Sequence, residues 1–408
     1  HRAVFAAGVL LGLVSEQMVL FAVPLLIFQN TDNVTYLGIA FALEWLPGLV
    51  TYPFAGLLAD LDGGARLFTR VTYGRAGILC CAAALCLVQR SWTTPVLIAD
   101  GFLLSMLVAP VRMSVEKMVP QVAGGELLAP TQSLVQNMEL LAMALGPALA
   151  LLAADLVGKV WLLVSAAGVF AIAASCWLPL PRGMRSPKVT SVADSLAQLK
   201  LGWLLLLRNR PVVMLGCLNF SINLAFATVL CANAAMVIGV FKAPQSSFAL
   251  LNTCVGVTGL INLLLIPWLL RKFKVEALGG FGFLLACTGL MLLGFAPSFG
   301  VYGPAFVGAL AGIAYFNVFN RTQRVRAIER EHLGKVMGPF YLLNLSSYPV
   351  AGLLVAVFGA RYGPQDLIIV LGAVLTVIGA VLLPLTAIGF RRLLAAREEA
   401  QRTAQVSV

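Results

Sequence analysis

Long runs of hydrophobic residues, interrupted by only a few polar positions, alternate along the whole chain with short polar connections. A helix needs about 20 mostly apolar residues to cross the hydrocarbon core of a bilayer, and each of these runs reaches that length. The pattern predicts an all-α integral membrane protein with twelve transmembrane helices in two pseudo-symmetric six-helix bundles. The expected spans are residues 3–29, 35–60, 66–89, 92–119, 126–155, 158–181, 211–240, 245–270, 275–297, 300–320, 335–360 and 366–390.

The composition excludes most classes of soluble protein. Of the 408 residues, 60% are hydrophobic and 11% are charged. An average soluble domain is roughly 45–50% apolar and about 25% charged. Because so few charges could not cover a soluble particle of this size, an ordinary soluble enzyme, a disordered chain and a secreted disulfide scaffold are excluded. Membrane lipid is therefore an expected partner of most of the chain.

The connections between the runs are short, with one exception. Between Arg182 and Arg210 the chain is polar, basic and serine-containing, which is typical of a linker. No connection is long enough for a soluble catalytic domain. We expect an N-terminal six-helix bundle over residues 1–181, a cytoplasmic linker over 182–210, a C-terminal six-helix bundle over 211–390 and a cytoplasmic tail over 391–408.

The two halves resemble each other at a constant offset. Glu126–Ala129 aligns with Glu331–Gly334, and Gly146-Pro147 lies opposite Ala351-Gly352. Parallel repeats of a six-helix unit place a substrate site near the midplane of the membrane, at the interface of the halves. Chance similarity between helices rich in leucine and alanine is the alternative interpretation.

Lysine and arginine are distributed unequally over the connections. Of 28 such residues, only Arg90, Lys159, Lys242 and Arg361 fall on the side opposite the linker and the tail. Since basic residues accumulate on the cytoplasmic side, we predict a multi-pass protein of the cell (inner, cytoplasmic) membrane with both termini in the cytoplasm. The asymmetry also accounts for the net charge of +11. Without a folded basic domain, we expect no nucleic-acid partner.

The connection after the second run contains a motif with a recognisable spacing. It reads GLLADLDGGAR over residues 56–66. This is similar to the inner-loop pattern G-x-L-a-D-r-x-G-r-r of the major facilitator superfamily, although Leu61 replaces the usual basic residue. Gly146-Pro147 in the fifth run resembles the family's antiporter motif. Together with Pro110-Val111-Arg112, these features resemble the enterobactin-exporter-like or multidrug-efflux branch of that superfamily.

The resemblance implies an inner gate at this connection. Gly56 would let two helices approach closely, and Asp60 can pair with Arg66 or with a helix terminus. Such a pair would lock the outward-facing state and break when the protein opens inward. Arg112 and Glu116 lie four residues apart, can pair, and belong to the expected gate. A plain surface ion pair, worth about 0–1 kcal/mol, is the alternative.

Four carboxylates lie deep within predicted spans: Glu16, Glu44 and Glu139 near mid-helix, and Asp100 deeper than a loop residue. Ionisable groups inside a membrane are costly and are functional candidates by default. Because burial favours the neutral form of an acid, such a group can bind a proton and release it when water gains access. We predict that Glu16, then Glu139, then Glu44 carries a coupling proton. Structural hydrogen bonding between helices is the alternative.

Polar side chains follow helical spacing in both halves. Acids and glutamines form the stripes of the N-terminal half, whereas asparagines and aromatic residues form those of the C-terminal half. These faces are expected to look into a water-accessible cavity. The predicted substrate-binding residues are Glu16, Trp45, Gln136, Glu139, Asn219, Asn223, Tyr315, Phe316, Tyr341 and Asn344.

The sequence contains no recognisable catalytic constellation. Eight cysteines are scattered through apolar runs, and His332 is the only histidine besides His1. Neither H-E-x-x-H nor G-x-S-x-G occurs. We therefore expect no enzyme activity, no cofactor and no metal site, and we interpret the cysteines as buried free thiols.

The leading hypothesis is a proton-coupled secondary active exporter that works by alternating access. From the resemblance, its small-molecule substrates are expected to be amphipathic organic compounds, either siderophores (or other metallophores) or drugs. Besides the substrate, protons are expected partners, and we expect a monomer. An importer or a lipid-like substrate carrier of the same fold is the alternative. From another class, a membrane-embedded enzyme would need a catalytic constellation, and a non-transporting sensor would need an output domain.

Overall fold

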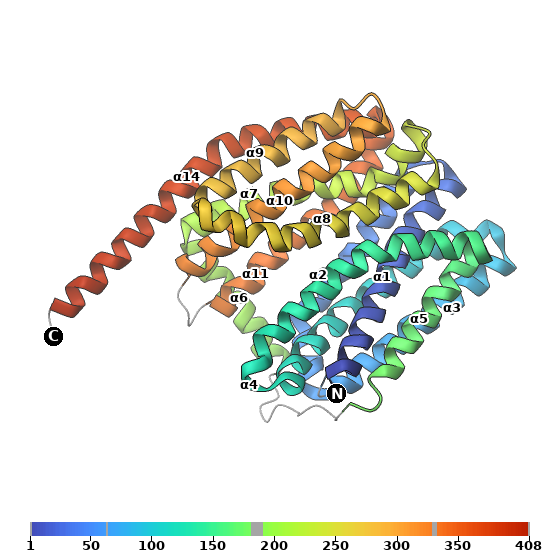
Figure 1. The fold of residues 1–408 in the computed structure, drawn as a ribbon, viewed down its shortest axis with the longest axis horizontal. Helices are drawn as coiled ribbons and strands as arrows, with labels where there is room; N and C mark the ends of the chain where they lie inside the picture. Colours follow the sequence, from blue (N-terminus) through green and yellow to red (C-terminus); the bar gives the residue numbers. More distant parts are fainter. Residues whose placement is uncertain (1, 63, 181–190, 329–332, 407–408) are drawn as a thin grey trace. The chain divides into compact units, whose positions relative to one another are not determined.

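The structure is a computed structural model that describes residues 2–62, 64–180, 191–328 and 333–406. Within these ranges all regular elements are helical and no strand occurs. In the order of Figure 1 they are α1 (Arg2–Thr31), α2 (Val34–Asp62), α3 (Ala65–Val88), η1 (Arg90–Trp92), α4 (Thr93–Val157), α5 (Lys159–Cys176), α6 (Val192–Arg208), α7 (Arg210–Ala234), η2 (Ala235–Val240), α8 (Gln245–Lys272), α9 (Val275–Gly294), α10 (Phe299–Ala327), α11 (Leu333–Leu345), α12 (Ser347–Leu354), η3 (Val355–Gly359), α13 (Ala360–Tyr362) and α14 (Pro364–Val406).

Among the described residues, twelve segments are long and apolar enough to cross a membrane. They agree in number and order with the twelve predicted runs, which confirms the prediction of an all-α membrane protein with twelve spans. Some ends differ from the prediction. The sixth span, α5, ends at Cys176 rather than at residue 181. The tenth span, α10, continues beyond the predicted end at residue 320 to Ala327, and its last turn contains basic residues such as Arg324.

α4 contains two of the predicted spans in one helix of 65 residues. The predicted break between residues 119 and 126 is wrong, because the helical backbone continues through it. Arg112 and Glu139 nevertheless lie 3.7 Å apart, whereas a straight helix between them would be about 40 Å long. α4 therefore reverses direction between the parts that belong to the spans Arg90–Val119, which begins with η1, and Asn137–Val157. We call these parts the first and second limbs.

The eleventh predicted run is interrupted rather than continuous. α11 ends just before Ser346, α12 follows directly, and η3 is a π-helical segment. The Ser346 hydroxyl donates to the Leu343 carbonyl and the Ser347 hydroxyl to the Asn344 carbonyl, each at 2.6 Å. Such local serine bonds compete with backbone hydrogen bonds, which explains a break at this point. The seventh span also ends in a π-helical segment, η2.

Contacts divide the chain into two compact units. Unit 1 consists of residues 1–195, 228–261 and 348–364, and unit 2 of residues 196–227, 262–347 and 365–408. Unit 1 therefore contains segments from both halves of the sequence, including η2, the start of α8, and η3. The predicted division of the chain at the linker into two bundles stays a prediction.

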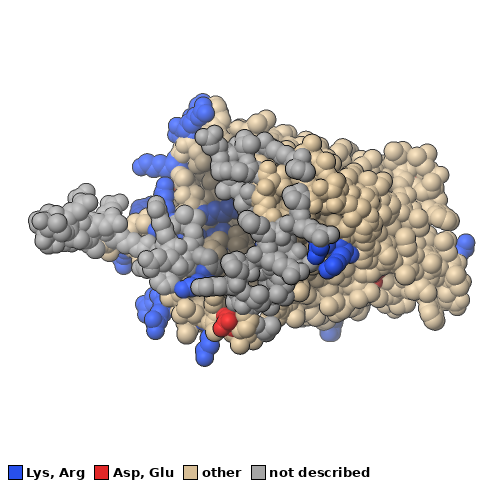
Figure 2. Space-filling view, turned by 90° about the horizontal axis from the view of Figure 1, so that it is seen from below, with Lys and Arg blue, Asp and Glu red and all other residues tan. Residues whose placement is uncertain are grey.

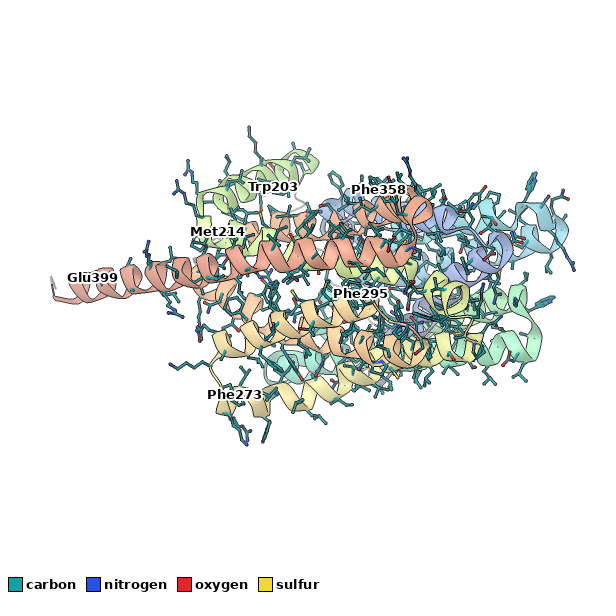
Figure 3. All side chains as sticks on the ribbon, turned by 90° about the horizontal axis from the view of Figure 1, so that it is seen from above. Trp203, Met214, Phe273, Phe295, Phe358 and Glu399 are labelled. Atoms are coloured by element: carbon teal, nitrogen blue, oxygen red, sulfur yellow. The ribbon has the colours of Figure 1, made fainter. Side chains whose placement is uncertain are left out.

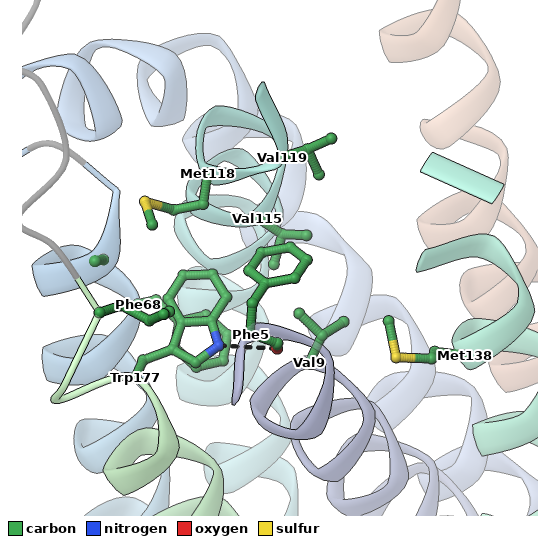
Figure 4. Packing of buried hydrophobic residues seen from close by; sticks show 10 residues of the cluster. Phe5, Val9, Phe68, Val115, Met118, Val119, Met138 and Trp177 are labelled. Carbon is green, nitrogen blue, oxygen red and sulfur yellow. Dashed lines mark hydrogen bonds between the residues drawn. The ribbon is translucent and has the colours of Figure 1, made fainter. Parts of the chain in front are cut away.

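An aromatic cluster in unit 1 joins α1 and α3 to the residue after α5 (Figure 4). Trp177 stacks on Phe68 and Phe5, with ring centroids 3.8 and 5.1 Å away. Its indole Nε1 donates to the Phe5 carbonyl at 3.1 Å. Gly8 lies under the same indole, where a Cβ would overlap the ring. A buried tryptophan with its N–H satisfied gives this packing both area and orientation.

In unit 1, α2 also packs closely against α12 and η3. A Cβ on Gly38 would overlap the backbone of Gly352 and Ala356, and a Cβ on Gly352 would overlap the backbone of Ala42. Thr35 adds a hydrogen bond from its hydroxyl to the Ala356 carbonyl at 3.3 Å. Small residues at this contact let two helix backbones approach, as is common between helices in membranes.

In unit 2, α9 and α10 form the tightest pair. Gly282 of α9 meets the backbone at Gly312 and Phe316 of α10, and Gly289 meets Ala309. Phe316 is fully buried at this contact. The pair therefore depends on small residues for its spacing and on aromatic rings for its buried area.

α14 is longer than a membrane crossing requires. It has 43 residues, or about 64 Å of helix, against about 30 Å of hydrocarbon. Gly389 lies against Pro211 and Met214 of α7, and beyond this contact α14 continues as one helix past Glu399 (Figure 3). The predicted tail from residue 391 is therefore helical as far as Val406.

Charged side chains are few on the visible surface. Figure 2 shows that Lys and Arg gather in one part of it, while the remainder is largely uncharged. The predicted orientation with both termini in the cytoplasm stays a prediction.

All eight cysteines are free thiols, but not all are buried as expected. Cys86, Cys231 and Cys287 are buried, whereas three others, Cys80, Cys81 and Cys217, are exposed. The last three lie on the outward faces of α3 and α7, where an apolar thiol needs no core to accept it.

Replacing Gly38 by leucine is expected to separate α2 from α12, because the new side chain would overlap the facing backbone. Overpacking of this kind costs about 1–3 kcal/mol. Thermal unfolding of the purified protein in detergent should show a melting temperature a few degrees below that of the parent, on the order of 1–5 °C. Gly77→Leu is the matched control, since a Cβ on Gly77 meets nothing within 4 Å. Equal midpoints for the two variants would contradict the close approach.

Candidate functional site

An ion pair lies in the interior of unit 1. Arg75 Nη2 of α3 donates to Glu16 Oε2 of α1 at 2.7 Å. The two side chains are 3% and 14% exposed. The Arg75 guanidinium also lies 4.3 Å from the centre of the Phe170 ring of α5. Because both charges are removed from solvent, each depends on the other for compensation.

Arg75 was not among the predicted site residues. The distribution of Lys and Arg over the two membrane sides counted Arg75 with an inner connection, because every basic residue was given to the nearest connection even when it lay inside a span. Its place well inside the predicted run 66–89 was the available signal. Glu16, the first-ranked candidate for the coupling proton, lies in the interior as expected, but its ion pair with Arg75 was not foreseen.

Two more acids of unit 1 lie near this pair. Glu44 of α2 is partly buried, and its Cβ lies 3.9 Å from the position of a Cβ on Gly101 of α4. Asp100 of α4 is 2% exposed, and neither of its carboxylate oxygens has a hydrogen-bond partner among the described residues. The site therefore contains more acid groups than cations that could pair with them in the interior.

The second-ranked predicted proton carrier, Glu139, contacts Arg112 across the two limbs of α4. The atoms Arg112 Nη1 and Glu139 Oε1 are 3.7 Å apart, and the side chains are 50% and 41% exposed. Glu116, the expected partner of Arg112, is exposed. The Gln136 side chain lies outside the described residues. An ion pair with this exposure is worth about 0–1 kcal/mol.

Three aromatic rings lie on the α2 side of unit 1. Trp45 and Tyr348 stack with ring centroids 4.2 Å apart, and Phe41 lies 6.2 Å from Trp45. All three side chains are partly exposed. Trp45 was a predicted substrate-binding residue, whereas Phe41 and Tyr348 were not, although Phe41 precedes Trp45 by one helical turn.

In unit 2, the predicted asparagines come together. Asn219 Nδ2 of α7 donates to Asn344 Oδ1 of α11 at 2.6 Å, and Asn223 Nδ2 reaches the same oxygen at 3.5 Å. Asn344 Nδ2 in turn donates to the Phe340 carbonyl at 2.6 Å. The Asn219 oxygen is buried without a partner among the described atoms. This amide cluster connects α7 to α11.

The predicted aromatic residues of unit 2 lie in different surroundings. Phe316 is fully buried and Tyr315 is 8% exposed, whereas Tyr341 is 58% exposed. Tyr341 lies 5.6 Å from the buried guanidinium of Arg324, which also lies 4.2 Å from the Phe340 ring. A role of these three residues in substrate binding stays a prediction.

The predicted inner gate is described only in part. The burial of Gly56 and the side chain of Asp60, as well as Gly63, lie outside what the structure describes, and Arg66 is partly buried in the first turn of α3. Gly64 has φ of 89°, in the left-handed region that favours glycine, and faces Met118 of α4. The positive φ explains why the motif has a glycine at this position, since other residues rarely adopt this conformation.

Glu16→Gln would leave the buried Arg75 without a counter-charge. Breaking a buried pair by removing one partner costs about 3–5 kcal/mol, so the melting midpoint is expected to fall well below that of the parent. Arg75→Gln should have a similar effect. The double variant leaves no unpaired charge and should be more stable than either single variant. Thermal unfolding in detergent measures all three.

Glu139→Gln is the control for these three variants. It removes an exposed ion pair with Arg112, so the free energy of unfolding should fall by only about 0–1 kcal/mol. Strictly additive losses in the Glu16 and Arg75 double variant would contradict the coupling of the two charges.

Comparisons with known proteins agree with this architecture. The family model of the Major Facilitator Superfamily matches residues 5–347. No curated protein matches the sequence significantly. The solved nucleoside transporter NupG has a TM-score of 0.74 at 14% identity, over 94% of this chain and 98% of that one.

Two further solved structures share the fold. A POT family transporter in complex with 5-aminolevulinic acid has a TM-score of 0.69 at 14% identity, over 95% of this chain and 96% of that one. The human organic anion transporter MFSD10 (TETRAN) has a TM-score of 0.62 at 17% identity, over 93% and 98%. These neighbours share the fold, and the match to the family model indicates a transporter and not an enzyme. The chain belongs to the major facilitator superfamily.

Proposed function

We propose that this transporter is a proton-coupled exporter of amphipathic small organic molecules that works by alternating access. The observation that carries the proposal is the buried ion pair between Glu16 and Arg75. A carboxylate in a span can be neutralised by a proton, and neutral Glu16 would no longer compensate the guanidinium. Proton binding therefore changes the interaction between α1 and α3.

The same pair provides a physical link between proton and cargo. A substrate with a cationic or strongly hydrogen-bonding group would compete with Arg75 for the Glu16 carboxylate. Proton and substrate then bind in alternation, because each is favoured when the other is absent. Glu139 and Glu44 are the second and third candidates for this role, and the exposure of Glu139 supports access from water.

The chemistry of the remaining polar groups supports an amphipathic cargo. Trp45 and Tyr348 offer flat, partly exposed rings, on which an apolar or aromatic part of a molecule can stack. Asn219, Asn223 and Asn344 offer amide groups to hydroxyls and amides of a substrate. Siderophores, other metallophores and hydrophobic drugs all combine these features. A nucleoside-like or acidic molecule is the alternative cargo, and an importer the alternative direction.

The direct test is transport in proteoliposomes. Four labelled probes, uridine, 5-aminolevulinic acid, tetraphenylphosphonium and a catecholate siderophore, are offered to vesicles with and without a pH gradient. For an exporter we expect a probe to accumulate against its gradient on the side from which protons are drawn, with a matching pH change inside the vesicles. Counterflow without any effect of the pH gradient would contradict proton coupling.

Glu16→Gln separates coupling from binding. Glutamine still offers the substrate a hydrogen-bonding group but cannot release a proton, so counterflow should be weakened but remain measurable, while proton-driven accumulation should fall at least about tenfold. The retained counterflow also shows that the variant is folded. Asp155→Asn, at an exposed position of α4, is the control and should change neither rate. Undiminished accumulation by Glu16→Gln would exclude Glu16 as the proton carrier.

Trp45→Leu tests the stacking surface. Loss of an aromatic contact worth about 0.5–1.5 kcal/mol should raise the half-saturation concentration of the transported probe roughly two- to tenfold. Trp161→Leu is the matched control, because Trp161 is an exposed tryptophan of α5, whereas the stacking rings belong to α2 and α12. Equal half-saturation concentrations in parent and Trp45→Leu would contradict the role of Trp45.

A further inference from the structure

Asp100 has no function in the ion pairs described above, yet it is the most deeply buried of the unit 1 acids whose side chains the structure describes. It lies two turns into the first limb of α4, about 10 Å from the start of the helix. Its side chain is 2% exposed and neither carboxylate oxygen has a hydrogen-bond partner among the described residues. An ionised carboxylate in such a place is strongly disfavoured, whereas a protonated one is neutral.

The groups that face Asp100 come from the helices packed against α4, which contacts α1, α2, α3 and α5. Arg75 and Cys86 of α3 interact electrostatically with Asp100, as does Glu44 of α2. α1 contributes Glu16, the present partner of Arg75. α5 contributes the uncharged Phe170 ring that covers the guanidinium. Arg75 is therefore the cation of this group that can compensate a charge on Asp100.

Arg75 also has a donor to spare. Its Nη2 is bonded to Glu16, but its Nε is buried with no acceptor among the described atoms. A buried donor without an acceptor and a buried acid without a donor thus occur in the same group of helices. Buried polar atoms are nearly always bonded, so two such exceptions call for a physical explanation.

We propose that Asp100 is a second proton-carrying carboxyl group and that Arg75 exchanges between Glu16 and Asp100 during transport. In the state described, Asp100 holds a proton and Glu16 is ionised against Arg75. In the exchanged state, Asp100 has released its proton and accepts the guanidinium, while Glu16 has taken up a proton. One proton moves from Asp100 to Glu16, the guanidinium stays charged throughout, and the net charge is unchanged.

The positions of the two acids give the exchange a direction. This step rests on the proposed function and on the predicted orientation with the N-terminus in the cytoplasm. In that orientation the first limb of α4 starts at the outer side, so Asp100 lies nearer the outside than Glu16, which lies midway along α1. The transfer therefore moves a proton inward, in the direction of an inward proton gradient.

Infrared difference spectroscopy of the full-length protein in detergent, without any ligand, tests the resting state. A protonated carboxylic acid has a carbonyl stretching band that an ionised carboxylate lacks. At neutral pH, the parent should show such a band with slow hydrogen–deuterium exchange, and Asp100→Asn should lack it. Asp155→Asn, at an exposed acid of the same helix, should retain it. An unchanged band in Asp100→Asn would overturn the proposal.

The exchange itself is tested through Arg75. Arg75→Lys keeps the charge but removes Nε, so the pH at which the acid band disappears should shift by one unit or more relative to the parent. This measurement needs no Asp100 variant and decides the proposal even if Asp100→Asn does not fold. An identical titration in parent and Arg75→Lys would overturn the exchange.

Transport in proteoliposomes separates this proposal from the proposed function. With the probe that the parent transports, Asp100→Asn should keep counterflow within about threefold and lose proton-driven accumulation at least about tenfold, and Asp100→Glu should restore part of it. Full accumulation by Asp100→Asn would overturn the second proton site. If the parent itself shows no proton-driven accumulation, the proposed function fails, while the infrared band still decides whether Asp100 carries a proton.

Discussion

A guanidinium buried between helices must have its charge compensated, and the helices around Arg75 are arranged to meet that requirement. Glu16 supplies the counter-charge from α1, and the Phe170 ring supplies a polarisable face from α5. Since burial removes the solvation of both ions, neither partner can change its charge without changing the energy of the contact between α1, α3 and α5. Protonation of Glu16 would therefore act on all three helices at once.

Unit 2 meets a comparable requirement with neutral groups. The amides of Asn219, Asn223 and Asn344 connect α7 and α11 without any net charge. Such a cluster can bind polar groups of a ligand but cannot titrate. At the offset predicted from the sequence, Glu139 corresponds to Asn344, so an acid in the first half of the chain has an amide as its counterpart in the second half.

Much of the fold could be predicted because hydrophobic span length is a local property. The twelve spans followed from run length. Helical spacing selected Asn219, Asn223 and Asn344 as polar positions, but it did not predict the hydrogen bonds between them. The continuous helix of α4 did not, because the apolar pattern pauses between residues 119 and 126 while the backbone hydrogen bonds continue. Arg75 was missed because every basic residue was assigned to a connection, even where it lay inside a predicted span. Its partner Glu16 lies on another helix, 59 residues away in the sequence, and no local pattern reveals such a contact.

The π-helical segments η2 and η3 have a further consequence for motion. A π-helical turn contains one residue more than an α-helical turn, so it holds an offset of about 100° in side-chain direction within an unbroken helix. η2 lies against Phe28 of α1, through Gly239, and η3 lies against Gly38 of α2. Movement of the extra residue along either helix would rotate the intervening side chains about the helix axis while the backbone stays hydrogen-bonded. The seventh and eleventh spans thus possess a means of twisting that costs no unwinding.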